Sequence, residues 1–303
     1  MKGDLAGGKD GGEFLVCYLD LLGYRQLVNE YHENKAVTSG IERAFKGVLE
    51  RNEGFKTREA NTPFALGNRI AAEHIKVGLI SDSMLIRMPT PENLPRLSKG
   101  IDDSLNAYCY VVIFLSCISD FYRWIAGTTR HFFRGAVTKG QHHESNPVSS
   151  KNLFVFSKAL VTAAELADQR INTRRHHFFR CFKKRMGTGG PPWVLLDESM
   201  VQYLKYLTAQ VPEDQRMEMT RREQKRVYLD VYFPLNSQAN LDHPATHNVL
   251  RDIVKAATWQ VGRNQHKRDV VEKYRWFAEY HNLRMKELDV KDQGLTIDFL
   301  NHG

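Results

Sequence analysis

The feature that most constrains this chain is a short apolar run that carries a single carboxylate near its end. Residues 14–22 are hydrophobic except for Asp20, and Gly23 follows them. A run of this length predicts a buried central strand. Because an acid in such a strand is costly to bury unless a cation accompanies it, the pattern indicates a functional site at Asp20.

A second run of the same kind lies about sixty residues later. Asp82 stands between Ile80-Ser81 and Ser83-Met84-Leu85-Ile86, and we expect residues 74–88 to form two strands that turn near Ser81 and Asp82. Two carboxylates carried by two core strands could share a hard divalent cation, with a phosphate-bearing substrate completing its ligands. Each acid taken alone could equally be an ordinary turn residue.

Composition bounds the class of protein. The 303 residues are 42% hydrophobic, enough for a sizeable core, and we expect one compact unit with additions. The net charge of +8 favours an anionic partner, which could be a nucleotide, a nucleic acid or an acidic membrane surface. The four cysteines form no CxxC pair, which predicts reduced thiols in a cytoplasmic protein. Residues 1–12 are polar and glycine-rich, so we expect a disordered lead-in rather than a signal peptide.

The order of elements predicts an α+β fold, with an antiparallel-type sheet and helices on one face. After a turn at residues 22–24, helices are expected at 24–31 and 37–49 and a loop at 52–68. The strand pair at 74–88 precedes a long helix at 102–126, whose apolar stretch at 108–118 is too short to span a bilayer. A strand at 131–140, a short strand at 154–156 and a helix at 157–167 follow.

The chain changes character beyond residue 170. Residues 170–185 carry seven Lys or Arg and no acid. This basic segment could be a solvated loop, a contact for nucleotide phosphates or a nucleic-acid-binding segment. We expect residues 13–170 to form the core and residues 171–303 a C-terminal extension packed on it, with a basic loop at 170–192, a strand at 227–233 and a helix at 270–285.

Four of these segments, in this order, resemble motifs of the class III nucleotidyl cyclases. They are YLDLLGY at 18–24, ISDS at 80–83, FRGAVTKG at 133–140 and FSKALVTAAEL at 156–166. The series is most similar to the pyrimidine cyclases of bacterial Pycsar anti-phage systems, over roughly residues 13–170. The resemblance implies a ferredoxin-like βααββαβ core.

The same resemblance implies an activity and an assembly. The activity is the conversion of UTP or CTP into 3′,5′-cyclic UMP or cyclic CMP with release of pyrophosphate, as a second messenger in anti-phage defence. The assembly is a head-to-tail homodimer with shared active sites. Two Mg²⁺ or Mn²⁺ ions are implied, one beside the ribose 3′-oxygen and one on the triphosphate.

Site residues follow from the resemblance by matching positions. The metal ligands would be Asp20, Leu21 and Asp82. The substrate contacts would be Leu22, Gly23, Tyr24, Ser81 and Lys158. The catalytic cations would be Arg134, Lys139 and Arg170.

One departure from the family pattern leaves alternatives open. Val161 and Glu165 stand where purine nucleotide cyclases carry an Asn and, four residues on, an Arg. Another cation could take over their role, as in the pyrimidine cyclases, or the chain could be a catalytically degenerate domain that binds nucleotides. A nucleic-acid-binding module using residues 170–185 is a third alternative. The His142-His143-Glu144 triplet lacks the i, i+4 spacing of a helical zinc motif and is not expected to bind metal.

Overall fold

The structure of the protein is a computed structural model. It describes residues 11–24, 29, 35–57, 63–80, 82–145, 154–168, 191–223, 225–235 and 243–298. Within these ranges the N-terminal half contains β1 (Gly11–Leu21), α2 (Lys35–Thr57), α3 (Pro63–His74), β2 (Lys76–Ile80), β3 (Ser83–Pro89), α4 (Asp103–Thr129), β4 (Phe133–Ser145), β5 (Phe154–Ser157) and α5 (Lys158–Asp168). The C-terminal half contains β6 (Val194–Leu196), α7 (Glu198–Ala209), β7 (Thr220–Glu223), β8 (Arg226–Leu229), α9 (Pro244–Arg263) and α10 (Arg268–Glu287).

The strands form one mixed sheet in the order β2-β3-β1-β4-β6-β8-β7, and β5 pairs with the far end of β4. Every strand pair is antiparallel except β4 with β6. The predicted α+β class with a mostly antiparallel sheet is therefore confirmed. β1 lies between β3 and β4, so the strand that carries Asp20 is central, as the apolar run predicted.

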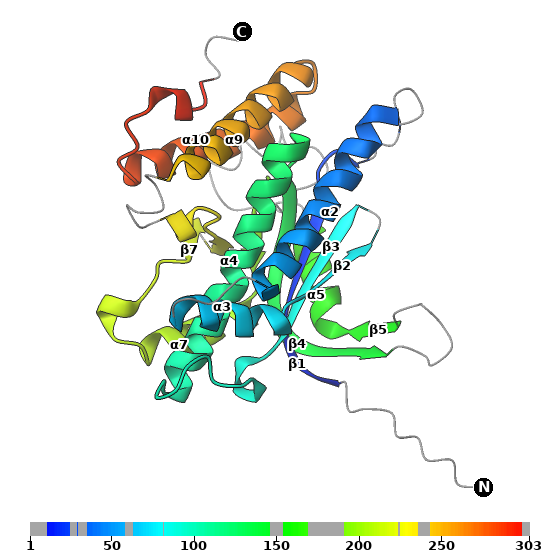
Figure 1. Ribbon diagram of the computed structural model, residues 1–303. Coiled ribbons are helices and arrows are strands. Elements are labelled where there is room, and N and C mark those ends of the chain that lie inside the picture. The colour runs from blue at the N-terminus through cyan, green and yellow to red at the C-terminus, as the bar shows by residue number, and fades with distance from the viewer. Residues whose placement is uncertain are drawn as a thin grey trace, which may run out of the picture.

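Helices cover both faces of the sheet unequally. Leu15, Cys17 and Leu19 of β1 point into the main core, which includes buried residues of α2, α3 and α4. Figure 1 shows α2 and α4 running side by side over the sheet. Because side chains alternate along a strand, Val16 points to the opposite face, where it packs with Leu85 against Ala159 of α5. Most helices thus lie on one face, and α5 covers part of the other.

The long helix α4 is the centre of the helical layer. Its N-cap is Asp102, whose side chain accepts a hydrogen bond of 2.8 Å from the backbone N–H of Leu105. α4 is the only helix in the described ranges that is long and apolar enough to cross a membrane, and most of that stretch is buried inside the protein. It occupies the position expected for the core helix predicted at 102–126.

The predicted loop at residues 52–68 is wrong over most of its length. α2 continues to Thr57, with Asn52 buried at 4% exposure, and α3 begins at Pro63. Two residues misled the prediction. Gly54 is tolerated inside α2, where a Cβ would meet nothing within 4 Å. Pro63 is the first residue of its helix, where a missing N–H costs no hydrogen bond.

The C-terminal half extends the same sheet. β6 runs parallel to β4, with Gly135 opposite Val194, and β8 and β7 follow it outward. The strand predicted at 227–233 ends at Leu229, while the helix predicted at 270–285 is confirmed as α10. The helices α7 and α9 were not predicted, although α9 begins with a proline at its first turn and buries Leu250, Ile253 and Val261 along one face.

Candidate active site

The two carboxylates singled out by the sequence come together at one end of the sheet. Asp20 is the penultimate residue of β1 and lies opposite Ser83 of β3. Asp82 occupies the tight turn that joins β2 to β3, and its carbonyl oxygen accepts a hydrogen bond of 3.1 Å from the backbone N–H of Leu21. A single backbone hydrogen bond thus ties the Asp82 turn to the end of the strand that carries Asp20.

Arg134 is the cation that accompanies Asp20. The two residues are register partners between β1 and β4, so their side chains point to the same face of the sheet. The Arg134 Nε donates to Asp20 Oδ2 at 2.9 Å, and the side chains are 17% and 18% exposed. The pair is therefore largely buried but reachable from solvent.

A tyrosine and a serine complete this face, and the sequence did not single them out as site residues. The Tyr18 hydroxyl and Ser83 Oγ share a hydrogen bond of 2.8 Å. Burial raises the pKa of Tyr18, and the negative charges of Asp20 and Asp82 raise it further. Both carboxylates are therefore close enough to Tyr18 for their charges to affect its pKa. The sequence signal that could have identified Tyr18 is its position two residues before Asp20, because residues two apart on a strand point to the same face.

Gly135 permits the close approach of β4 to β1 next to this site. A Cβ at residue 135 would lie 2.3 Å from the Tyr18 carbonyl oxygen and 2.5 Å from Leu19 Cδ2. Side chains larger than hydrogen cannot be accommodated there without moving one strand. The glycine that follows Arg134 therefore sets the spacing on which the Arg134 to Asp20 contact depends.

The turn at residues 22–24 follows directly from the end of β1. The backbone N–H of Leu22 donates to the Phe132 carbonyl oxygen at 2.9 Å, and Gly23 adopts a φ of 84°, which favours glycine. The turn rests on His131, whose Nδ1 lies 3.3 Å from the Leu22 carbonyl oxygen. Burial lowers the pKa of His131 to about 4, so this ring is neutral at pH 7.

Other predicted site residues lie elsewhere. Lys139 pairs with Leu15 in the register, five residues beyond Arg134 and on the opposite face of the sheet. That separation is about 17 Å along the strand, and the Lys139 ammonium forms an ion pair with Glu13. Lys158 is exposed at the start of α5, beside the pairing of Ser157 with His142 at the far end of β4. Within one chain, the structure does not bring these lysines to Asp20.

The remaining predicted site residues either have buried side chains or lie outside the described residues. The side chains of Leu21 and Leu22 are buried, so only their backbone groups could contact a ligand. Ser81, Arg170 and the basic segment 170–185 lie outside the described residues, as does most of the helix predicted at 24–31. On α5, Val161 and Glu165 are exposed.

The chemistry of the donor set fits a hard divalent cation that a substrate helps to hold. Asp20 and Asp82 offer carboxylate oxygens, which are the ligands that Mg²⁺ and Mn²⁺ prefer. The side chain of Asp82 forms no hydrogen bond or ion pair with the described part of the chain. No cluster of three or more His, Cys, Asp or Glu residues suited to a metal occurs among the described residues. Two carboxylates alone leave most ligand positions to water and substrate phosphates.

The His142-His143-Glu144 triplet lies on β4 and not in a loop. His142 Nε2 lies 2.8 Å from Glu144 Oε1, and Glu144 forms an ion pair with Arg87 of β3. The Glu144 carboxylate thus has both His142 and Arg87 as partners.

Of the comparisons with known proteins, the one with solved structures returned matches. No protein-family model matches the chain, and no curated protein matches it. Among solved structures, the chain is similar to the guanylyl cyclase Cya2, with 11% identity, a TM-score of 0.35, and 73% of this chain and 92% of that chain covered. The adenylyl cyclase CyaB from P. aeruginosa has 12% identity and a TM-score of 0.36, with 72% and 93% covered. The guanylyl cyclase domain of a RhoGC fusion protein from the aquatic fungus Blastocladiella emersonii has 11% identity and a TM-score of 0.37, with 72% and 94% covered.

Proposed function

We propose that this protein is a nucleotide cyclase of the class III type, which converts a pyrimidine nucleoside triphosphate into its 3′,5′-cyclic monophosphate and pyrophosphate. The observation that carries the proposal is the convergence of Asp20 and Asp82 at one end of the sheet, with the turn at 22–24 beside them. Carboxylates at the ends of two core strands have a use in phosphoryl chemistry that involves divalent ions.

In this proposal the carboxylates bind the metal ions and the turn at residues 22–24 contacts the phosphates. Asp20 and Asp82 would hold two Mg²⁺ or Mn²⁺ ions, and the backbone of Leu21 would assist. Bound ions of this kind lower the pKa of a ribose 3′-hydroxyl and neutralise charge on a triphosphate. Of the backbone N–H groups at the turn of residues 22–24, those of Gly23 and Tyr24 would face the phosphates, because the Leu22 N–H already donates to the Phe132 carbonyl oxygen.

Arg134 is the strongest candidate for the cation that replaces the missing Asn and Arg. It alone among the described candidates lies beside Asp20, and a planar guanidinium can bind phosphate oxygens in bidentate fashion. In the proposed reaction it stabilises negative charge that develops on the transferred and leaving phosphates. Lys139 and Lys158 remain candidates only through the head-to-tail homodimer, in which a second subunit would complete each site. Arg170, which lies outside the described residues, also remains a candidate.

The finer assignments belong to the same proposal. They are the choice of UTP or CTP, with UTP ahead, a cytoplasmic location and a second-messenger role in anti-phage defence. They rest on the sequence motifs at residues 18–24, 80–83, 133–140 and 156–166, and not on a base-reading residue of the described site.

One observation favours a second candidate, a degenerate cyclase-like domain that binds nucleotides without turnover. The carboxylate of Asp20 already has the Arg134 guanidinium as its partner at 2.9 Å, and Val161 and Glu165 stand in place of the usual catalytic pair. In this alternative Arg134 takes the place of a metal and no chemistry follows.

Incubation of the purified protein with each of the four nucleoside triphosphates, in Mg²⁺ or Mn²⁺, separates the two candidates. The proposal predicts a cyclic monophosphate and pyrophosphate from UTP or CTP, resolved by chromatography. Cyclic product from ATP or GTP instead would support the proposed cyclase activity and contradict the proposed pyrimidine substrate. Absence of cyclic product from all four would favour the degenerate domain.

A further inference from the structure

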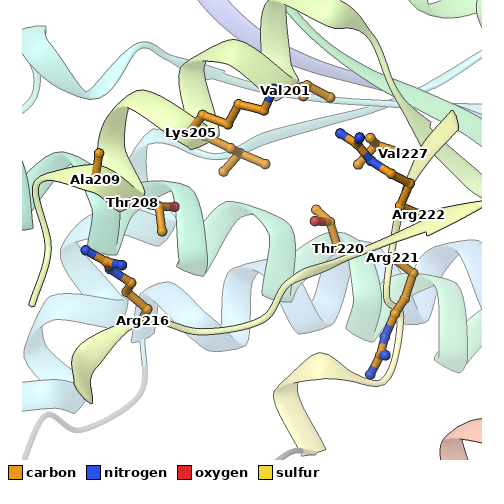
Figure 2. Close-up of a pocket in the computed structure, with 10 residues that line it drawn as sticks. Val201, Lys205, Thr208, Ala209, Arg216, Thr220, Arg221, Arg222 and Val227 are labelled. Atoms are coloured by element: carbon orange, nitrogen blue, oxygen red, sulfur yellow. The ribbon is translucent and has the colours of Figure 1, made fainter. Parts of the chain in front are cut away.

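A basic cavity lies at the edge of the sheet opposite to β2. It has a volume of about 410 Å³ and is formed by α7, the segment after it and the strands β7 and β8 (Figure 2). Four strand spacings separate β1 from β7 in the sheet order, which is about 19 Å. The cavity is therefore separate from the candidate active site at Asp20.

Four cations and no carboxylate line this cavity among the described residues. They are Lys205, Arg216, Arg221 and Arg222. The charge of Arg221 is neutralised by three carboxylates that do not line the cavity. Its guanidinium lies 2.8 Å from Glu287, 3.5 Å from Asp230 and 3.7 Å from Glu218. Figure 2 shows its side chain pointing away from the other cations.

The other three cations carry uncompensated charge. The side chains of Lys205 and Arg222 form no ion pair or hydrogen bond with the residues that the structure describes. The Nε of Arg216 donates to the Val211 carbonyl oxygen at 2.9 Å, and this contact fixes the side chain without neutralising it. All three are exposed. Like charges gathered around one cavity repel each other, and an anion in the cavity would relieve that repulsion.

The rest of the lining indicates what kind of anion fits. Thr208 and Thr220 supply hydroxyl groups, and Val201, Leu204 and Val227 supply an apolar wall. None of the described lining residues is aromatic, so these residues offer a nucleic-acid base no ring to stack on. Recognition must come mainly from the anionic groups of the ligand, which arginine binds in bidentate fashion.

Arg216 and Arg222 lie on opposite sides of the cavity, as Figure 2 shows, with Thr220 between them. Two linked phosphoryl groups can offer the cation on each side its own anionic partner. We propose that this cavity binds a small phosphorylated ligand with at least two phosphoryl groups, at a site distinct from the Asp20 and Asp82 site.

The probe for this site is inorganic pyrophosphate, titrated calorimetrically into the full-length protein in the presence of EDTA at constant ionic strength. EDTA removes divalent ions, so binding does not depend on a metal at Asp20 and Asp82. We expect one saturable site with a Kd below about 1 mM. Inorganic phosphate should bind at least about tenfold more weakly, because it engages one side of the cavity only.

Variants of the cavity residues test whether pyrophosphate binds in the cavity. Lys205→Gln with Arg222→Gln should weaken pyrophosphate binding at least about tenfold, since two charge-assisted contacts are lost. The matched control, Arg43→Gln with Lys46→Gln, removes the same charge from the exposed surface of α2 and should leave the affinity unchanged. Arg174→Gln with Arg175→Gln should also leave it unchanged, which separates the cavity from the basic segment 170–185.

Two results would overturn the proposal. One is pyrophosphate binding that the cavity variant and the α2 control weaken equally, which would indicate a response to net charge alone. The other is the absence of saturable binding to the wild type. Asp82→Asn should bind pyrophosphate in EDTA like the wild type, so the cavity and the proposed cyclase activity can fail independently.

Discussion

Arg134 and Asp20 face each other across the β1 and β4 ladder, with Nε of Arg134 2.9 Å from Oδ2 of Asp20. Each side chain keeps less than a fifth of its surface exposed. Removal of the guanidinium therefore leaves a carboxylate in a poorly solvated place, and both stability and chemistry should respond.

We expect Arg134→Ala to lower the free energy of unfolding by about 1.5–3 kcal/mol at pH 7, because a largely buried carboxylate loses a charged hydrogen-bond donor. Denaturant unfolding measures this directly. The control is Arg96→Ala, which breaks an exposed pair in which Arg96 lies 2.8 Å from Asp103 with side chains 58% and 85% exposed. That loss should stay below about 1 kcal/mol. Equal losses in the two variants would mean that the Arg134 pair is no more important than a surface pair.

Gly135 gives a second prediction about the same strand pair. A methyl group there collides with the Tyr18 carbonyl oxygen at 2.3 Å, so Gly135→Ala should destabilise the protein by about 1–3 kcal/mol, the range for overpacking. Gly40→Ala is the matched control, since nothing lies within 4 Å of a Cβ in that helical position. It should be neutral or stabilising by up to about 1 kcal/mol. Thermal unfolding of both variants decides the point, and a stable Gly135→Ala protein would contradict the predicted collision.

The buried histidines predict how stability depends on pH. Burial lowers the pKa of His131 and of His281 to about 4, below the value of about 6.5 in an unfolded chain. The folded state therefore binds fewer protons, so this stability is fully present above about pH 6.5 and is lost as pH falls toward 4.

His131→Gln removes one of these titrating groups. Between pH 7 and pH 5 its unfolding free energy should fall by about 2 kcal/mol less than that of the wild type, as the lowered pKa of His131 implies. Urea unfolding at a series of pH values provides the measurement. Parallel pH curves for the two proteins would show that His131 contributes nothing to the acid sensitivity.

The strands that carry the candidate site could be predicted from the sequence because their signals are local. Asp20 and Asp82 interrupt apolar runs, and the strand at 14–20 and the strand pair around residue 82 are confirmed. Turn chemistry also placed Gly23 correctly, at a φ of 84°.

The errors arose where tertiary contacts override local signals. Gly54 and Pro63 indicated a loop, yet the packing of α2 and α3 tolerates both residues inside or at the start of helices. The approach of Gly135 to Tyr18 and the contact of His131 with Leu22 involve residues more than a hundred positions apart. Neither leaves a periodic pattern that a reading of the chain could detect.

The assignment of Lys139 and Lys158 to the site rested on sequence motifs alone. The alternation of β4 places Lys139 on the face opposite to Arg134, and strand pairing places Lys158 at the far end of β4. Spacing along a strand could have separated Lys139 from Arg134, because an odd separation reverses the face.

The central claim is that Asp20 and Asp82 hold the divalent ions of a nucleotide cyclase, and Asp82→Asn tests it most directly. This isosteric change keeps the turn and removes a carboxylate that has no hydrogen-bond or ion-pair partner in the described part of the chain. The control, Asp252→Asn, removes a half-exposed carboxylate from α9. The measurement is the rate of cyclic nucleotide formation from UTP and CTP in Mn²⁺, with folding checked by circular dichroism. The account predicts a loss of at least about a hundredfold in Asp82→Asn, as expected when a group that stabilises the transition state is removed, and little change in Asp252→Asn. Wild-type activity in a folded Asp82→Asn protein would contradict the account.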